Sequence, residues 1–169
     1  SEISVANTSV LRFADDDTSS DFRDANVTGF DTRLYTEDSK WRFEASGAYS
    51  NLSYPDSNSN GYRYLVRVSE VQGVVKYGLG HGVESEFFNP NDLGFLRQAN
   101  EVEQFAWVEF ATINPVWIVN EGRLEISGFY SQLYNPRVYT HTGIRADYNM
   151  TFKNYYSMGG GAAWNPREG

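Results

Sequence analysis

Residues 138–152 carry the sequence VYTHTGIRADYNMTF. Every second residue from Val138 to Phe152 is uncharged, and the charged residues Arg145 and Asp147 both fall on the interleaved positions. A helix could not place charges two residues apart on one face, because its side chains repeat about every 3.6 residues. The run therefore predicts a β-strand with one apolar and one polar face.

The same alternation recurs along the whole chain. It predicts an all-β fold of about nine antiparallel up-and-down strands and no helix. The predicted strands cover residues 3–13, 25–36, 41–50, 62–69, 74–84, 102–113, 123–131, 138–152 and 155–164. Charged residues fall on the polar face of these strands: Arg42, Glu44, Arg63, Arg67, Lys76, Arg123, Glu125, Arg145 and Asp147. His81 is the one doubtful residue on the apolar face, and we expect it near the rim.

Composition narrows the class of protein. The chain has 169 residues with 40% hydrophobic and 16% aromatic residues, a net charge of −8 and no cysteine. An acidic chain is a poor partner for nucleic acid, and a cysteine-free chain has neither disulfides nor thiolate metal sites. The apolar run 116–119 is far shorter than the roughly 20 residues of a membrane helix. A membrane β-barrel remains compatible with this composition, because its signal is alternation rather than hydropathy.

Strand length and connection length favour such a barrel. The predicted strands have about 8–15 residues, near the roughly 9–11 of a tilted membrane-spanning strand. Long polar connections (14–24, 54–60 and 87–100) alternate with short ones (37–40, 72–73 and 153–154), while 114–121 and 132–137 are intermediate. Outer-membrane barrels alternate long external loops with short periplasmic turns. We therefore expect a transmembrane β-barrel, and nine strands suggest a partial one.

Aromatic residues flank the connections that this interpretation assigns to the periplasmic side. They are Tyr35, Trp41, Trp117, Phe152 and Tyr156. Amphipathic rings gather at the membrane–water interface, so we expect an aromatic girdle there. The simpler explanation, that Trp and Tyr favour strands in general, accounts for their number but not for their position.

Glycines line one face of a single predicted strand at Gly78, Gly80 and Gly82. A phosphate-binding loop would need a following helix, which the pattern lacks. A row of glycines instead lets another backbone approach closely. We expect the connection 87–100 to fold inward over this glycine track and constrict the lumen. The strand around residues 105–108 is bulky on both faces, so its lumen side should pack against something.

Other motifs carry little chemistry. The acidic run from Asp15 to Asp24 could bind calcium, although it lacks the spacing of an EF-hand. The pairs Glu84/Glu86 and Glu101/Glu103 could serve glycoside hydrolysis only at a set separation, which the sequence does not give. His81 and His141 fall on opposite faces of distant strands. No catalytic set, metal site or cofactor is predicted.

Four segments resemble segments of a known protein family: 71–81, 87–97, 130–137 and 151–154. They resemble the C-terminal β-barrel domain, of unknown function, of Gram-negative outer-membrane proteins that carry an N-terminal family 9 carbohydrate-binding-like domain. The match covers about residues 40–169, and its most specific part is the loop. The loop residues that we expect to constrict the lumen are Phe88, Asn89, Asn91, Asp92, Leu93, Phe95 and Arg97. The resemblance implies a large exported barrel and no catalytic residues.

Departures from the family pattern are also informative. The carbohydrate-binding-like domain is absent from residues 1–169, and the family barrel is much longer than this chain. Gln98 stands where a second basic residue is expected in the loop. We therefore expect residues 1–169 to be one segment of an outer-membrane barrel.

Three functions remain open. The first is a polar-lined pore or docking channel in the bacterial outer membrane, constricted by loop 87–100. Its partners would be the lipid bilayer or detergent, and other outer-membrane or secreted proteins. The second is a soluble β-barrel binding module for sugar or lipid, although soluble barrels of this length normally keep their apolar faces inside. The third, suggested only by the family's sugar-binding neighbour, is a glycan-degrading enzyme.

Overall fold

The computed structural model describes residues 1–11, 24–90, 99–112 and 114–166. Within these ranges the chain forms nine β-strands and no helix. No helix long and apolar enough to cross a membrane therefore occurs in the described part of the chain. The strands are β1 (Glu2–Val10), β2 (Asp24–Tyr35), β3 (Trp41–Tyr54), β4 (Ser57–Glu70), β5 (Val75–Glu84), β6 (Glu101–Ala111), β7 (Val119–Leu133), β8 (Tyr139–Phe152) and β9 (Ser157–Trp164).

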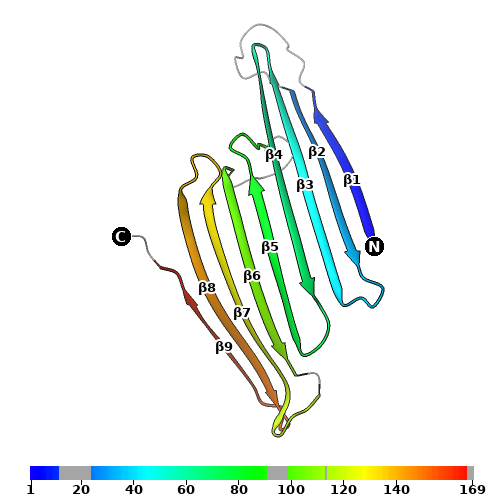
Figure 1. Ribbon diagram of the computed structural model, residues 1–169, viewed down its shortest axis with the longest axis vertical. Helices are drawn as coiled ribbons and strands as arrows, with labels where there is room; N and C mark the ends of the chain where they lie inside the picture. Colours follow the sequence, from blue (N-terminus) through cyan, green and yellow to red (C-terminus); the bar gives the residue numbers. More distant parts are fainter. Residues whose placement is uncertain (12–23, 91–98, 113, 167–169) are drawn as a thin grey trace.

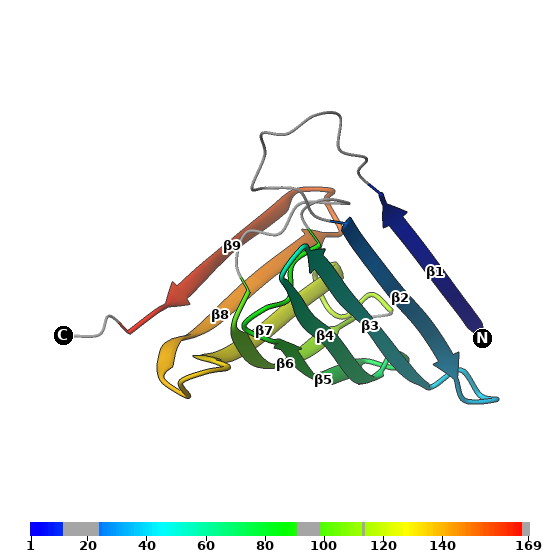
Figure 2. The same ribbon diagram turned by 90° about the horizontal axis from the view of Figure 1, so that it is seen from above.

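All nine strands belong to one antiparallel sheet in which each strand pairs with its neighbour in sequence (Figure 1). The predicted all-β, up-and-down arrangement of nine strands is thus confirmed. The sheet is open, since β1 and β9 each have a partner on one side only. Viewed from above, it bends into an arch with β1 and β9 at its two edges (Figure 2).

The pairing register carries the alternation of each strand across the sheet. Residues that face the same way in neighbouring strands are Cα partners, such as Phe43 with Val68, and Val68 with Leu79. We call the resulting surface the apolar face; its central residues are Phe43, Ala45, Val66, Val68, Leu79, Ala106, Val108, Ile126, Ile144 and Ala146. The opposite surface, the polar face, carries all nine charged residues assigned to it from the sequence.

Burial on the two faces is the reverse of that in a soluble sheet. Phe43 and Leu79 on the apolar face are 45% and 59% exposed, whereas Glu109 on the polar face is 7% exposed. No second layer covers the apolar face within the described residues, because every set of strand–strand contacts joins sequence neighbours of the one sheet. Exposed apolar surfaces of this extent mark contact with lipid, protein or ligand.

One connection differs from the sequence prediction. Residues 54–60 were expected to form a long polar loop, but β3 and β4 continue to Tyr54 and Ser57, which pair directly across a turn at residues 55–56. Side-chain hydrogen bonds between the strands take up the polar groups: Asn51 donates to Asn60 over 2.5 Å, and Asn58 accepts from Ser53 over 2.8 Å. The polar residues thus belong to a strand hairpin, and the alternation of connection lengths is weaker than predicted.

A short turn at the other end of the sheet joins β2 to β3. Thr36 donates its hydroxyl to the Asp38 carboxylate over 2.5 Å, and the Lys40 amide donates to the same carboxylate over 3.0 Å. These two hydrogen bonds hold the pKa of Asp38 below its ordinary value. Gln72, in the turn between β4 and β5, donates to the Asp38 carbonyl over 3.0 Å. Neighbouring turns at this end are therefore tied together.

Candidate functional site

The polar face holds a network of ion pairs that crosses β5, β6 and β7. Lys76 lies 2.9 Å from Glu109, which lies 2.7 Å from Arg123 on its other side. Arg123 also contacts Glu125 at 2.6 Å. Glu109 is buried between two cations, and such an arrangement satisfies a carboxylate that would otherwise be costly to bury. Further pairs on this face join Arg33 to Glu44, Arg42 to Glu44, Arg63 to Glu84 and Arg145 to Asp147.

Rings from β6 fill the glycine track on the same face. Gly78, Gly80 and Gly82 lie side by side on one face of β5, opposite Trp107, Phe105 and Glu103. A Cβ atom at Gly78 would lie 2.6 Å from the indole nitrogen of Trp107, and one at Gly80 would overlap the Phe105 ring. Arg67 covers the other side of that ring at 5.2 Å from its centroid. The track therefore accommodates aromatic side chains at Gly78 and Gly80, while residues 91–98 of the loop expected over it lie outside the described residues.

The same rings explain why residues 105–108 of β6 are bulky on both faces. One side of residues 105–108 was predicted to pack against something, and on the polar face Phe105 and Trp107 lie over glycines of β5. A glycine is required at Gly80 because any side chain there would occupy the volume of the Phe105 ring.

The segment after β5 folds onto the polar face at the ends of β3 and β4. Its first residue, Ser85, extends the ladder, since its amide donates to the Tyr62 carbonyl over 2.9 Å and its hydroxyl accepts from the Tyr62 amide over 2.8 Å. Phe88 is 2% exposed, and a Cβ atom at Gly61 would overlap its backbone nitrogen. The Asn89 amide donates to the Ser50 hydroxyl over 3.0 Å. Gly61 and Ser50 thus anchor this segment on the polar face.

Only the first two of the predicted constricting residues, Phe88 and Asn89, belong to this anchored segment. The others, Asn91, Asp92, Leu93, Phe95 and Arg97, lie outside the described residues, as does Gln98. Nothing in the residue types at Gly61 and Ser50 indicated their role, because a serine and a glycine in a strand are common. Only the fold of the hairpin brings them to residues 85–90.

A set of asparagines ties the two connections at this end together. Asn100 donates its side-chain amide to the Asn135 carbonyl over 2.8 Å, and its side-chain oxygen accepts from the Asn135 amide over 2.8 Å. Asn135 in turn donates to Glu86 over 2.9 Å. The bases of the connections before β6 and before β8 are therefore held at a fixed spacing.

The predicted girdle residues lie at the end of the sheet with the turns 36–40 and 71–74, but not all on one face. Trp41 lies on the apolar face and contacts Tyr77 edge to face at 5.8 Å. Tyr35 pairs with Arg42, which puts it on the polar face. Trp117 and Tyr156 lie in turns, and Trp117 is 82% exposed. Glu70 shares the apolar face with Trp41 but pairs with Lys40 at 3.3 Å at the rim.

A second aromatic row, missed in the sequence, lies at the opposite end of the apolar face. Tyr62 and Tyr134 share a hydrogen bond of 2.8 Å between their hydroxyls. His81 lies beside Tyr64, with a contact of 3.3 Å between ring nitrogen and hydroxyl, so this doubtful residue belongs to the row. The row comprises Tyr49, Tyr62, Tyr64, His81, Tyr130, Tyr134 and Tyr139. Reading the face positions at both ends of each predicted strand would have revealed it.

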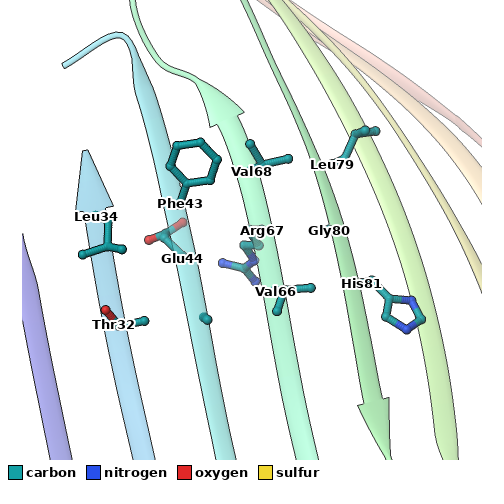
Figure 3. Close-up of a pocket in the computed structure, with 11 residues that line it drawn as sticks. Thr32, Leu34, Phe43, Glu44, Val66, Arg67, Val68, Leu79, Gly80 and His81 are labelled. Atoms are coloured by element: carbon teal, nitrogen blue, oxygen red, sulfur yellow. The ribbon is translucent and has the colours of Figure 1, made fainter. Parts of the chain in front are cut away.

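The apolar face is hollowed between Trp41 and Tyr77 at one end and the tyrosine row at the other. A shallow depression of about 450 Å³ lies across β2 to β5. Figure 3 shows Leu34, Phe43, Val66, Val68 and Leu79 along it. Aliphatic and aromatic carbon lines most of this surface. The depression can accept flexible apolar groups, but it offers no catalytic arrangement.

The remaining candidate residues form no metal site in the described part of the chain. No group of three His, Asp or Glu side chains in the described ranges could hold a metal ion. Glu84 and Glu101 are Cα partners, while Glu86 bonds to Asn135. Most of the acidic run proposed for calcium, from Asp15 to Asp21, lies outside the described residues.

The sequence profile of one protein family, described as domain of unknown function DUF5916, matches residues 1–169. The chain belongs to this family. The match covers the whole chain and agrees with the resemblance to a domain of unknown function. No curated protein and no solved structure matches the chain.

Proposed function

We propose that this DUF5916 chain is a segment of an outer-membrane β-barrel, with its apolar face in lipid and its polar face lining a pore or docking channel. The observation that carries the proposal is the reversed burial of the sheet. Leu79 and Phe43 are exposed on a broad apolar surface, whereas the charged side chains contact one another on the opposite face. A sheet in water has no reason to expose its apolar face, but a sheet in a bilayer does.

Aromatic residues at the two ends of the apolar face, Trp41 with Tyr77 at one end and the tyrosine row at the other, support the same placement. Trp41 and Tyr49 lie eight residues apart on β3, which corresponds to roughly 26 Å of strand at about 3.3 Å per residue. A strand tilt of about 40° reduces this distance to about 20 Å, near the ~25 Å apolar band of outer-membrane barrels. Tyrosine and tryptophan favour both edges of that band because one end of each ring is polar.

The polar face has the character of a channel wall. Its ion pairs combine cations and carboxylates, so it suits polar solutes without strong selectivity for one charge. The anchored segment at Phe88 and Asn89 lies on this face. It directs the start of the 87–100 connection toward the interior, which is where a constricting loop must enter.

The strand count supports the proposal that further strands complete the barrel. In an up-and-down sheet of nine strands, β1 and β9 run in the same direction. Direct pairing of β1 with β9 would therefore be parallel, whereas bacterial outer-membrane barrels are antiparallel with an even number of strands. An odd number of additional strands would satisfy both edges.

The test uses the absence of cysteine, which permits single-cysteine labelling without background. Leu65→Cys, Val66→Cys, Arg67→Cys and Val68→Cys cover two residues of each face on one strand. Each variant is spin-labelled in the protein reconstituted into phospholipid vesicles. Collision with molecular oxygen, which concentrates in lipid, is compared with collision with a water-soluble nickel complex. We expect the labels at 66 and 68 to favour oxygen and those at 65 and 67 to favour nickel.

The alternatives give different results. A soluble binding module would remain monodisperse without detergent, and its labels at 66 and 68 would not become accessible to oxygen on addition of vesicles. Either result would refute the membrane placement. Equal accessibility at all four positions would also refute it, because it would mean that the two faces share one environment.

A further inference from the structure

The apolar face ends abruptly beyond Tyr49 and Tyr62. The next residues on the same face are amides and hydroxyls that are hydrogen-bonded across the strands. Asn26 donates to Ser9 over 2.6 Å and accepts from Asn7 over 3.2 Å, and Asn51 donates to Asn60 over 2.5 Å. The register places these groups in rows: Asn7 with Thr28, Ser9 with Asn26, Asn26 with Asn51, Asn51 with Asn60, and Ser53 with Asn58.

The polar face also changes at the level of Tyr49 and Tyr62, where its charged residues end. Below it, the first four strands carry the charged residues Asp31, Arg33, Arg42, Glu44, Arg63 and Arg67. Above it they carry uncharged residues: the apolar Val10, Val27, Ala25 and Leu52 and the hydroxyl-bearing Thr8, Ser50, Ser57 and Ser59. Ala25 and Leu52 are almost fully buried. Phe88 is buried beside Gly61 on this upper part. The charged residues of the polar face and the apolar residues of the apolar face therefore end at one line across β1 to β4.

Strand length accounts for the position of that line. β3 and β4 have 14 residues each, whereas a tilted strand needs roughly 9–11 to cross a bilayer. The excess of about three to five residues corresponds to the ends of the hairpin beyond Tyr49 and Tyr62. In Figure 1 the β3–β4 hairpin extends past the ends of β5 to β8.

From these observations we infer that the bilayer ends at Tyr49 and Tyr62, and that the ends of β1 to β4 form a ridge that stands in water. This ridge comprises residues 7–10, 24–28, 50–54 and 57–61. The inference rests on the proposed function and adds the boundary of the lipid contact. Outward-facing asparagines suit water, because each amide has more donors and acceptors than its neighbour satisfies and hydrocarbon offers none. The inward-facing residues form a small core of their own, on which the 85–90 segment is anchored.

The test compares four single-cysteine variants that all face outward in the same two strands. Asn51→Cys and Asn60→Cys lie on the ridge, and Ala45→Cys and Val66→Cys lie in the proposed lipid band. The protein in phospholipid vesicles is treated with a membrane-impermeant maleimide, and a sample unfolded in urea gives the full reaction. We expect the thiols at positions 51 and 60 to react several-fold faster than the thiols at positions 45 and 66. Ser53→Cys and Asn58→Cys provide a second ridge pair if a substituted amide prevents folding.

Spin labels at the same four positions also report collision with molecular oxygen and with the nickel complex, and the outcomes separate the two proposals. If all four positions react with the maleimide, the lipid contact itself fails, and the boundary fails with it. If positions 45 and 66 are protected and favour oxygen, while 51 and 60 also favour oxygen, lipid contact stands and the boundary at the tyrosines is wrong. If positions 51 and 60 react with neither the maleimide nor oxygen, another protein surface covers the ridge. That result also overturns the exposure of the ridge to water.

Discussion

At the scale of single residues, aromatic rings of one strand lie over glycines of the next at five places. The pairs are Phe30 over Gly47, Trp107 over Gly78, Phe105 over Gly80, Phe129 over Gly143 and Tyr148 over Gly160, and each is a Cα pair in the register. A glycine in a strand loses packing and backbone entropy. A ring lying across it restores the contact, which is the arrangement known to compensate strand glycines.

Substitution within the glycine track should therefore depend strongly on position. Gly80→Ala should lower the free energy of unfolding by about 1–3 kcal/mol, because the added methyl group overlaps the Phe105 ring and forces it aside. Gly82→Ala is the matched control, since its Cβ atom would lie 3.4 Å from the nearest atom, a Leu65 methyl group. Urea unfolding in detergent, followed by tryptophan fluorescence, measures both. Equal effects of the two substitutions would contradict the ring–glycine interpretation.

The turn between β2 and β3 gives a prediction for pH dependence. The Thr36 hydroxyl and the Lys40 amide lower the pKa of Asp38 from its ordinary 3.8. As the pH falls, Asp38 therefore binds its proton at a higher pH in the unfolded chain than in the folded chain. The contribution of Asp38 to stability is present above pH 3.8 and is lost as the pH falls through the lower folded pKa.

Thr36→Val should raise the pKa of Asp38 toward 3.8, whereas Thr36→Ser, which keeps the hydroxyl, should leave it low. NMR titration of the Asp38 carboxyl carbon measures the pKa in each variant. An unchanged pKa in Thr36→Val would show that the hydroxyl is not its principal cause.

At the scale of elements, the β3–β4 hairpin and the 85–90 segment act together. Alternation in the sequence predicted both strands, but it ended them at residues 50 and 62, where polar residues begin. Cross-strand amide pairs such as Asn51 with Asn60 extend the hairpin instead. Residue type alone could not distinguish a polar loop from a polar strand, since this distinction depends on the environment of the hairpin.

Release of the 85–90 segment should alter the proposed channel. Gly61→Ala places a methyl group on the Phe88 backbone nitrogen and should displace residues 85–90 from the polar face. We expect faster hydrogen exchange at the Asn89 amide and a larger conductance of the protein in planar bilayers. Gly128→Ala is the control, because its Cβ atom would make only ordinary contacts at 3.6 Å and 3.9 Å. Faster exchange with unchanged conductance would separate the anchor from the proposed constriction.

At the scale of the whole molecule, the sheet formed by the described residues has two free edges and an uncovered apolar face. Ile3 and Val5 on the edge strand β1 are exposed, as is Trp164 on β9. Exposed edges and apolar faces favour association with other strands or with lipid.

Removal of detergent should therefore cause the purified chain to self-associate. The apolar face would be buried between copies, because water solvates it poorly. Size-exclusion chromatography with light scattering, with and without detergent, measures the change. A monodisperse monomer without detergent, with unchanged circular dichroism, would show that the apolar face does not require lipid.

The sequence by itself determined the number of strands, their antiparallel order and the sorting of charges to one face, because a period of two is a local property of the chain. It also determined that Gly78, Gly80 and Gly82 share a face. Only the tertiary structure decided that Phe105 and Trp107 fill this track, that Phe88 is anchored on Gly61, and that the second aromatic row runs from Tyr49 to Tyr139. These relations join residues on different strands, and they depend on a pairing register that alternation within one strand does not specify.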